Sequence, residues 1–344
     1  MMSGRRVFAV VAAIAVIHAG FLLAQEAAPA LPAATPDEVT PALEAATAKG
    51  LAWLAAQQNA DGAFGNDSNY GPHVGITGMA GMAFMSDGHL PGRGRYGPAV
   101  ERCVRFILAN RSETGVLAAQ TSHGPMYGHG FATLFLAEVY GSSRDPQVHE
   151  TLRRAVRLIV ATQNDEGGWR YQPVRKDADI SVTICQIMAL RAARNAGIFV
   201  EKDTIDRAVQ YVKNCQETDG GFRYMINMSG SAFPRSGAGV AALQYAGIYS
   251  GPEIERGLAY LMKHLPPQQG PETHYIYGHY YTAQAMFLAG DAYWRTWWPA
   301  IRDELLARQN DDGSWQDEAG KEYGTAMALI ILQMPNRLLP IFQR

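Results

Sequence analysis

The chain has 344 residues, of which 47% are hydrophobic and 18% are charged, and its formal net charge is −2 at pH 7. It therefore lacks the positive field that binds nucleic acid or an anionic membrane surface, and we expect no nucleic-acid partner. Cys103, Cys185 and Cys215 show no CxxC spacing, so they predict small buried side chains rather than a disulfide framework or a zinc cluster.

The first residues are predicted to be an export signal and not part of the fold. Arg5 and Arg6 precede an apolar run over residues 7–23. A short positive segment, an apolar segment and a small residue such as Ala24 are typical of a secretory signal peptide. We therefore expect residues 1–24 to be removed near Ala24 and the mature protein to be periplasmic or secreted, with no membrane span after removal. An uncleaved signal serving as an anchor is the alternative, and either the general or the twin-arginine route fits. Residues 25–41, rich in Ala and Pro, are predicted to be a linker.

A repeated pattern of the form Gln-x3-Gly-x-aromatic dominates the rest of the chain. It begins at Gln58, Gln163, Gln216 and Gln309, and the interval from Gln163 to Gln216 is 53 residues. The intervals on either side are about twice as long, and degenerate copies lie at residues 110–115 and 264–270. The sequence therefore predicts six units with a period near 50 residues, which is typical of solenoids and closed arrays.

Each unit is predicted to be a helix, a glycine turn and a second helix. Charged residues gather in the first helix of each pair, whereas the second helix is nearly free of charge. We expect the second helices over residues 76–84, 131–140, 181–196, 238–246, 281–288 and 325–332. The predicted fold is all-α: an α/α toroid of about six helix pairs over residues 42–334, with an inner and an outer ring, followed by a C-terminal tail over residues 335–344. An open solenoid is the alternative, but it would expose an apolar helix layer.

The repeat resembles the QW motif of the squalene cyclase and prenyltransferase family of toroids. The match is complete at Gln163, Gly167 and Trp169 and again at Gln309, Gly313 and Trp315, while Phe64 and Phe222 replace Trp in two other copies. The resemblance implies a structural role for these residues, with the Gln joining the end of an outer helix to the next inner helix and the aromatic ring stacking on it.

In such a ring the N-terminal ends of the inner helices meet at one mouth, with unpaired N–H groups and positive dipole ends. The triplets Tyr127-Gly128-His129 and Tyr277-Gly278-His279 fall in opposite units, so we expect the two histidines to face one another across the cavity. Arg235 is expected at the same mouth. A purely structural role, as helix caps or loop ties, is the alternative for each of these residues. Methionines on the inner helices predict an apolar, adaptable wall beneath the mouth.

Residues 177–181, Asp-Ala-Asp-Ile-Ser, resemble the Asp-x-Asp-Asp-Thr motif of squalene–hopene cyclases, whose middle Asp protonates an alkene. The resemblance implies that Asp179 is the acid and Asp177 its partner, which would raise the pKa of Asp179. Ile180 replaces the third carboxylate of the motif. Asp179 is equally a plausible N-cap of the following helix.

The leading hypothesis is a toroid that binds an apolar isoprenoid-like ligand and, if it is an enzyme, converts that ligand by acid catalysis as a cyclase or isomerase, with no cofactor and no metal. The second is a non-catalytic toroid that binds a protein partner. The third is a carbohydrate-active lyase or hydrolase, in which Ca²⁺ at Asp177 and Asp179 would be possible. Protein prenyl transfer is excluded because its zinc site needs an Asp-x-Cys pair, which the sequence lacks.

Overall fold

A computed structural model of the chain describes residues 38–119, 124–267 and 273–344, which belong to one compact unit. The described residues form twelve α-helices and two short 3₁₀ turns, and they contain no β-strand. The predicted signal over residues 1–24 and residues 25–37 of the predicted linker lie outside the described residues, whereas residues 38–41 of the linker lead into the first helix. None of the helices in the described part is long and apolar enough to cross a membrane.

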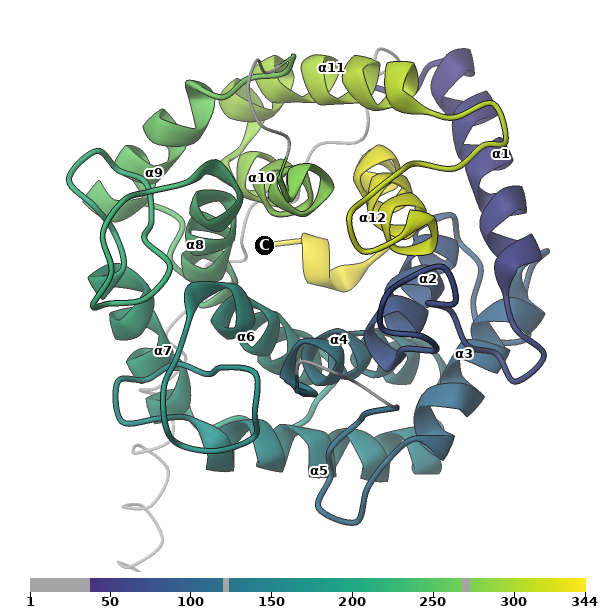
Figure 1. The fold of residues 1–344 in the computed structure, drawn as a ribbon, viewed down its shortest axis with the longest axis horizontal. Coiled ribbons are helices and arrows are strands. Elements are labelled where there is room, and N and C mark those ends of the chain that lie inside the picture. The colour runs from purple at the N-terminus through teal and green to yellow at the C-terminus, as the bar shows by residue number, and fades with distance from the viewer. Residues whose placement is uncertain (1–37, 120–123, 268–272) are drawn as a thin grey trace, which may run out of the picture. The chain divides into compact units, whose positions relative to one another are not determined.

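The helices alternate along the chain between an outer and an inner ring (Figure 1). The outer helices are α1 (Pro41–Gln57), α3 (Gly97–Ala109), α5 (Pro146–Thr162), α7 (Lys202–Asn214), α9 (Pro252–Met262) and α11 (Asp291–Arg308). The inner helices are α2 (Val74–Ser86), α4 (Met126–Ser143), α6 (Ile180–Asn195), α8 (Phe233–Tyr245), α10 (Tyr275–Ala289) and α12 (Lys321–Leu332). The predicted pairs and their order are confirmed.

The inner ring is closed. Each inner helix packs against the next, and α12 packs against α2, the first inner helix. The open solenoid is therefore excluded and the predicted α/α toroid is confirmed. In a ring of six, helices three places apart face each other, so α6 lies opposite α12 (Figure 1).

Burial explains why the two helices of a pair differ in sequence. Every residue of α2 is buried, and its Gly78 lies close to the backbone of α4, where an added Cβ would approach the Phe131 carbonyl oxygen to 3.1 Å. The outer helix α5 instead buries one stripe at helical spacing, which includes Val148, Leu152 and Ile159. Apolar inner helices and amphipathic outer helices are therefore what the two-layer ring requires.

The repeated Gln ties neighbouring units together, although in a different way from the expected one. The side-chain amide of Gln163 donates to the Gly167 carbonyl oxygen at 2.8 Å and to the Thr204 carbonyl oxygen, in the first turn of the next outer helix, also at 2.8 Å. The bond therefore joins one outer helix to the next outer helix, and the expectation of an inner-helix partner is wrong. Gln58, Gln216 and Gln309 make the corresponding bonds in their own units.

The Gly and the aromatic residue of the motif serve the same turn. Gly167 has φ 97°, and an added Cβ would lie 2.2 Å from the Arg207 carbonyl oxygen, so only glycine fits there. The indole N–H of Trp169 donates to the Ile159 carbonyl oxygen at 2.7 Å, and its backbone N–H donates to the Thr183 hydroxyl at 3.1 Å. Trp169 therefore links the outer helix α5 to the inner helix α6.

The C-terminal tail folds back into the ring (Figure 1). The 3₁₀ turn Met334–Asn336 leads into the tail and Pro340–Phe342 lies within it, and Ile341 is fully buried. The amide of Asn336 donates to the Ser86 carbonyl oxygen at 3.0 Å, and the Arg344 guanidinium donates to the Leu288 carbonyl oxygen. Both acceptors lie at the C-terminal ends of inner helices. The tail therefore covers the end of the ring where the inner helices end, and it does not cover the end where they begin.

Candidate functional site

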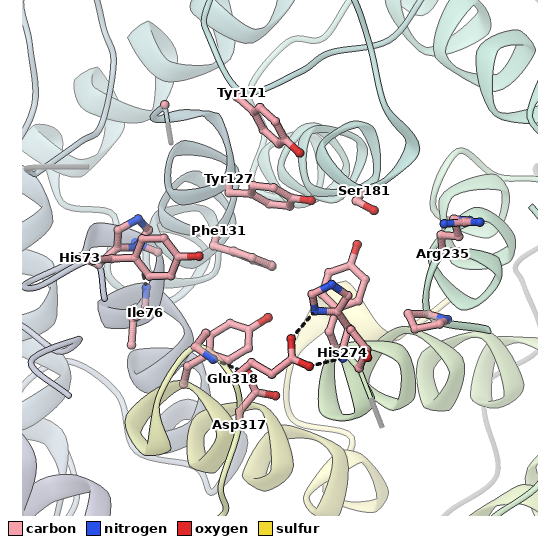
Figure 2. A pocket seen from close by; sticks show the side chains of 18 of the residues that line it. His73, Ile76, Tyr127, Phe131, Tyr171, Ser181, Arg235, His274, Asp317 and Glu318 are labelled. Atoms are coloured by element: carbon pink, nitrogen blue, oxygen red, sulfur yellow. Dashed lines mark hydrogen bonds and ion pairs between the residues drawn. The ribbon is translucent and has the colours of Figure 1, made fainter. Parts of the chain in front are cut away.

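A cavity of about 710 Å³ opens where the inner helices begin. Its wall includes Tyr323 near the start of α12. It also includes Ser181 near the start of α6, with His73 and His274 at the N-caps of α2 and α10 (Figure 2). The convergence of helix starts on one mouth is therefore as the sequence predicts. The size lies within the range of cavities that enclose small ligands.

Seven aromatic rings line the cavity. They are those of Tyr70, Tyr127, Phe131, Tyr171, Tyr224, Tyr277 and Tyr323. The methionines expected to form this wall, including Met79, Met188 and Met327, are fully buried in the helix packing and do not line the cavity. The prediction of a methionine wall is wrong, because these side chains face the space between helices. The cavity offers rings with hydroxyl groups instead.

The aromatic wall has a sequence signal that the motif analysis missed. Tyr171 lies two residues after Trp169 of its repeat, and Tyr224 lies two residues after Phe222 of the next one. Their hydroxyl groups are 2.5 Å apart and share a hydrogen bond. In the last repeat the same place, two residues after Trp315, is taken by Asp317, which also lines the cavity. This position therefore faces the cavity in three units.

Asp179 lies just behind this wall, at the N-cap of α6. Its Oδ1 accepts a hydrogen bond of 2.8 Å from the Val182 N–H, and its side chain is fully buried, so it does not itself line the cavity. Its Oδ2 has no hydrogen-bond partner in the described part, and the Arg170 Nε lies 3.7 Å away. Burial raises the pKa of Asp179 to about 6, against the opposing effects of the Val182 N–H, the Tyr224 hydroxyl and Arg170.

Asp177 does not act as the expected pKa partner of Asp179. Its carboxylate is partly exposed and binds the Arg170 guanidinium at 2.5 Å. Burial is the cause that raises the pKa of Asp179. The two carboxylates instead share one arginine, which binds Asp177 closely and lies 3.7 Å from the buried Asp179.

His129 is a structural tie and does not face the cavity. Its side chain is fully buried, its Nδ1 accepts from the Leu117 N–H at 3.1 Å, and its Nε2 lies 3.3 Å from the Ala155 carbonyl oxygen. Burial lowers its pKa to about 4. In the third unit the Thr183 hydroxyl accepts the equivalent N–H, from Trp169, so His129 replaces a threonine of the repeat.

His279 is likewise fully buried and does not line the cavity. Its ring packs among Phe233, Tyr275 and Trp297, with centroid distances of 4.8, 4.4 and 5.8 Å. Burial lowers its pKa to about 3. The expectation that His129 and His279 face each other across the cavity is therefore wrong. Both positions follow a mouth tyrosine by two residues along a helix, so they point away from the side that the tyrosine faces.

Tyr127, Tyr277 and Arg235 do line the cavity, where the sequence places them. The Tyr277 hydroxyl is buried and has no hydrogen-bond partner in the described part. Arg235 is held by two backbone carbonyl groups, with Nε donating to Phe222 at 3.0 Å and Nη2 to Gly230 at 2.8 Å. Their roles in binding remain predictions.

Two adjacent carboxylates that sequence reasoning missed lie on the α12 side of the cavity (Figure 2). Glu318 is engaged by His274, whose Nδ1 lies 3.0 Å from one carboxylate oxygen and whose N–H donates to the other at 3.2 Å. Asp317 accepts a hydrogen bond of 2.9 Å from the Ala319 N–H, and no side chain in the described part binds its carboxylate. Burial, together with the nearby Glu318, raises the pKa of Asp317.

Within residues 38–119, 124–267 and 273–344 no three His, Cys, Asp or Glu side chains are grouped so that they could hold a metal ion. Asp177 and Asp179, considered above for Ca²⁺, face Arg170, and an adjacent guanidinium opposes cation binding. Cys103, Cys185 and Cys215 are free and buried, as predicted.

The family model of the prenyltransferase alpha-alpha toroid domain matches residues 8–131 and 99–270, which is more than half of the chain. The chain belongs to this family. Drimenyl diphosphate synthase of Streptomyces showdoensis is 28% identical to this chain over 190 residues. The matched part is 54% of this chain and 33% of the synthase. The chain therefore spans about a third of the length of that relative.

Solved structures of two enzyme classes share the toroid. The type II terpene cyclase MstE from Scytonema, in complex with its substrate geranylgeranyl dihydroxybenzoate, has a TM-score of 0.61 and 16% identity, covering 87% of this chain and 98% of that one. An α-1,6-mannanase of Salegentibacter in complex with α-1,6-mannotriose has a TM-score of 0.63 and 9% identity, covering 86% and 99%. At such identities the likeness concerns the fold.

Proposed function

We propose that the toroid binds an apolar isoprenoid-type ligand in the tyrosine-lined cavity and isomerises it by acid catalysis. The observation that carries this proposal is the buried Asp179 behind the aromatic wall. A carboxyl group with a pKa raised to about 6 keeps part of its population protonated near neutral pH. Aromatic faces stabilise the positive charge that protonation of an alkene creates. The terpene cyclase fold of the chain agrees with this assignment.

We propose that the proton reaches the cavity by way of Tyr224. Tyr224 lines the cavity, and its hydroxyl is close enough to Asp179 to affect its pKa. In the proposed step the Tyr224 hydroxyl gives its proton to an alkene carbon while Asp179 returns a proton to the tyrosine. The π electron pair forms the new C–H bond and leaves a carbocation. Tyr171, hydrogen-bonded to Tyr224, holds the hydroxyl at the wall.

Binding is tested by titrating the full chain with farnesol, geranylgeraniol and squalene and measuring the shift in thermal unfolding midpoint. Ala319→Trp, which fills the cavity from its wall, is expected to abolish the shift. Ala60→Trp, at an exposed outer turn, is the matched control and is expected to retain it. A shift of equal size in Ala319→Trp would contradict binding in this cavity.

A glycan is the second candidate ligand, and one observation favours it. The mannanase structure is of an inactive variant in which two adjacent aspartates are replaced by asparagine, and the adjacent carboxylates Asp317 and Glu318 line the cavity here. Glycoside hydrolysis uses a pair of carboxylates, one of them with a raised pKa. Glu318 is bound by His274, however, which makes it a weaker partner. The same titration with α-1,6-mannotriose separates the two candidates.

Export remains a proposal on the sequence of residues 1–24. N-terminal sequencing of the protein isolated from its native host tests it. A mature chain beginning near residue 25 supports cleavage, and a chain beginning at the first residues indicates an uncleaved signal.

A further inference from the structure

The carboxyl group of Asp317 faces the cavity from the side opposite the start of α6, where Asp179 lies behind the wall. Asp179 precedes α6, and Asp317 precedes α12. These helices are three places apart in the closed inner ring, so the two residues mark opposite sides of the mouth (Figure 1). In the close view Asp317 lies across the cavity from Tyr171, Tyr127 and Ser181 (Figure 2).

Asp317 is a carboxylate of the cavity that no side chain in the described part binds. Glu318 and His274 occupy each other, and Arg235 is fixed by two carbonyl groups. The Nδ1 of His73 accepts the Gly75 N–H, and burial lowers the pKa of that histidine to about 4. Asp317 is held by backbone N–H groups, that of Ala319 on Oδ1 at 2.9 Å and that of Glu318, while no side chain in the described part binds it.

A carbocation formed in this cavity would be stabilised by a nearby anion. The starts of the inner helices carry the positive ends of the helix dipoles, which disfavour a cation at the mouth. Water also reaches the mouth, because Asp317 and Tyr323 are partly exposed. An unguarded cation would therefore be captured by water and leave as an alcohol.

Resting on the proposed function, we propose that Asp317 is the base that ends the reaction by removing a proton from the final carbocation. The C–H bond next to the cationic carbon breaks, its electron pair forms a C=C bond, and the proton moves to the Asp317 carboxylate. Asp317 then returns this proton to solvent at the mouth, and Asp179 is reprotonated from solvent. One proton enters and one leaves, so the reaction is an isomerisation without oxidation or reduction.

The test is to incubate the full chain with farnesol, geranylgeraniol and squalene in D₂O and to analyse the products by mass spectrometry. Wild-type protein is expected to yield mainly alkene products that carry deuterium from the protonation step. Asp317→Asn keeps the Oδ1 acceptor for Ala319, so it is expected to fold, to incorporate deuterium and to raise the alcohol-to-alkene ratio at least about tenfold. Asp317→Glu is expected to restore much of the alkene.

Asp311→Asn, at an exposed position in the turn before the same helix, is the matched control and is expected to keep the wild-type ratio. Deuterium incorporation with an unchanged ratio in Asp317→Asn would overturn the role of Asp317 and leave the proposed function standing. The absence of deuterium from all three probes with wild-type protein would overturn the acid catalysis itself, and the role of Asp317 with it.

Discussion

The side-chain amide of Gln309 donates a hydrogen bond of 2.9 Å to the carbonyl oxygen of Ala46, which joins the last repeat to the first helix. The same amide donates to Gly313 at 3.0 Å, as the Gln of the other units does in its own turn. The hydrogen bond by which each Gln joins neighbouring outer helices therefore also closes the outer ring. This closing bond joins residues 263 apart in the sequence, whereas the ties of Gln58, Gln163 and Gln216 join residues 37 to 41 apart.

We expect Gln309→Ala to lower the free energy of unfolding by about 1–3 kcal/mol, because two carbonyl groups lose their partner. Gln163→Ala, at a more deeply buried copy, is expected to cost at least as much. Gln210→Ala, on an exposed helix face, is the control and should change stability by less than about 0.5 kcal/mol. Urea unfolding measures all three, and equal midpoints would contradict the structural role of the repeat.

His129→Thr is expected to reduce the acid sensitivity of the fold. Because the pKa of His129 is lowered to about 4, the unfolded chain binds this proton more readily than the folded chain below about pH 6.5. The wild-type protein therefore loses stability as pH falls from about 6.5 to about 4, by about 3 kcal/mol from this residue. Threonine supplies the hydroxyl acceptor that Leu117 needs and does not titrate.

Unfolding in urea across this pH range tests the prediction. His129→Thr should show a shallower loss of stability on acidification than the wild type. His129→Ala, which leaves the Leu117 N–H unpaired, should be less stable than His129→Thr at neutral pH. Parallel pH curves for the wild type and His129→Thr would refute the assignment.

The architecture could be predicted from the sequence because it repeats. A motif such as Gln163 to Trp169 marks each turn, and the charge contrast between paired helices assigns them to the two rings. The cavity wall was harder to predict. Tyr171, Tyr224 and Asp317 lie in loops after the motif, and their shared direction depends on how each loop returns to the next inner helix.

The roles of the two histidines were mispredicted for a related reason. A mouth was inferred from helix starts, but which side of a helix faces the cavity depends on the rotation of that helix against its neighbours. Tyr127 and Tyr277 face the ligand space, whereas His129 and His279 turn toward the outer ring. The burial of Asp179 could not be predicted either. The sequence indicates that Asp179 is an N-cap, but it does not show which residues enclose its side chain.

Asp179→Asn is expected to keep the protein folded while removing the proposed acid. Asparagine keeps the Oδ1 acceptor for the Val182 N–H, so the helix cap survives. The pKa of Asp179 is raised to about 6, so the folded wild-type chain holds the proton more tightly and loses stability as pH rises from about 4 to about 6.

The variant lacks this loss and at pH 7 should gain up to about 3 kcal/mol relative to the wild type. It should also fail to incorporate deuterium into any probe. Thermal unfolding at pH 4 and pH 7 measures the first effect. A variant less stable than the wild type at pH 7 would contradict the burial of an unsatisfied carboxylate.

Ile341→Ala tests whether the C-terminal tail packs against the ends of the inner helices. Ile341 is fully buried among the ends of the inner helices, and its truncation should lower the free energy of unfolding by about 2–5 kcal/mol. Leu338→Ala, in the same tail but 52% exposed, is the matched control and should change it by less than about 0.5 kcal/mol. Equal effects in a denaturation series would show that the tail does not pack as described.

The central claim, that the cavity holds an apolar isoprenoid-type ligand, is tested most directly by purifying the protein from its native host and extracting it with organic solvent. Mass spectrometry of the extract should reveal an isoprenoid lipid in a molar amount close to that of the protein, and Ala319→Trp purified in parallel should lack it. A folded wild-type protein whose extract contains no lipid, or that retains a glycan instead, would contradict the account.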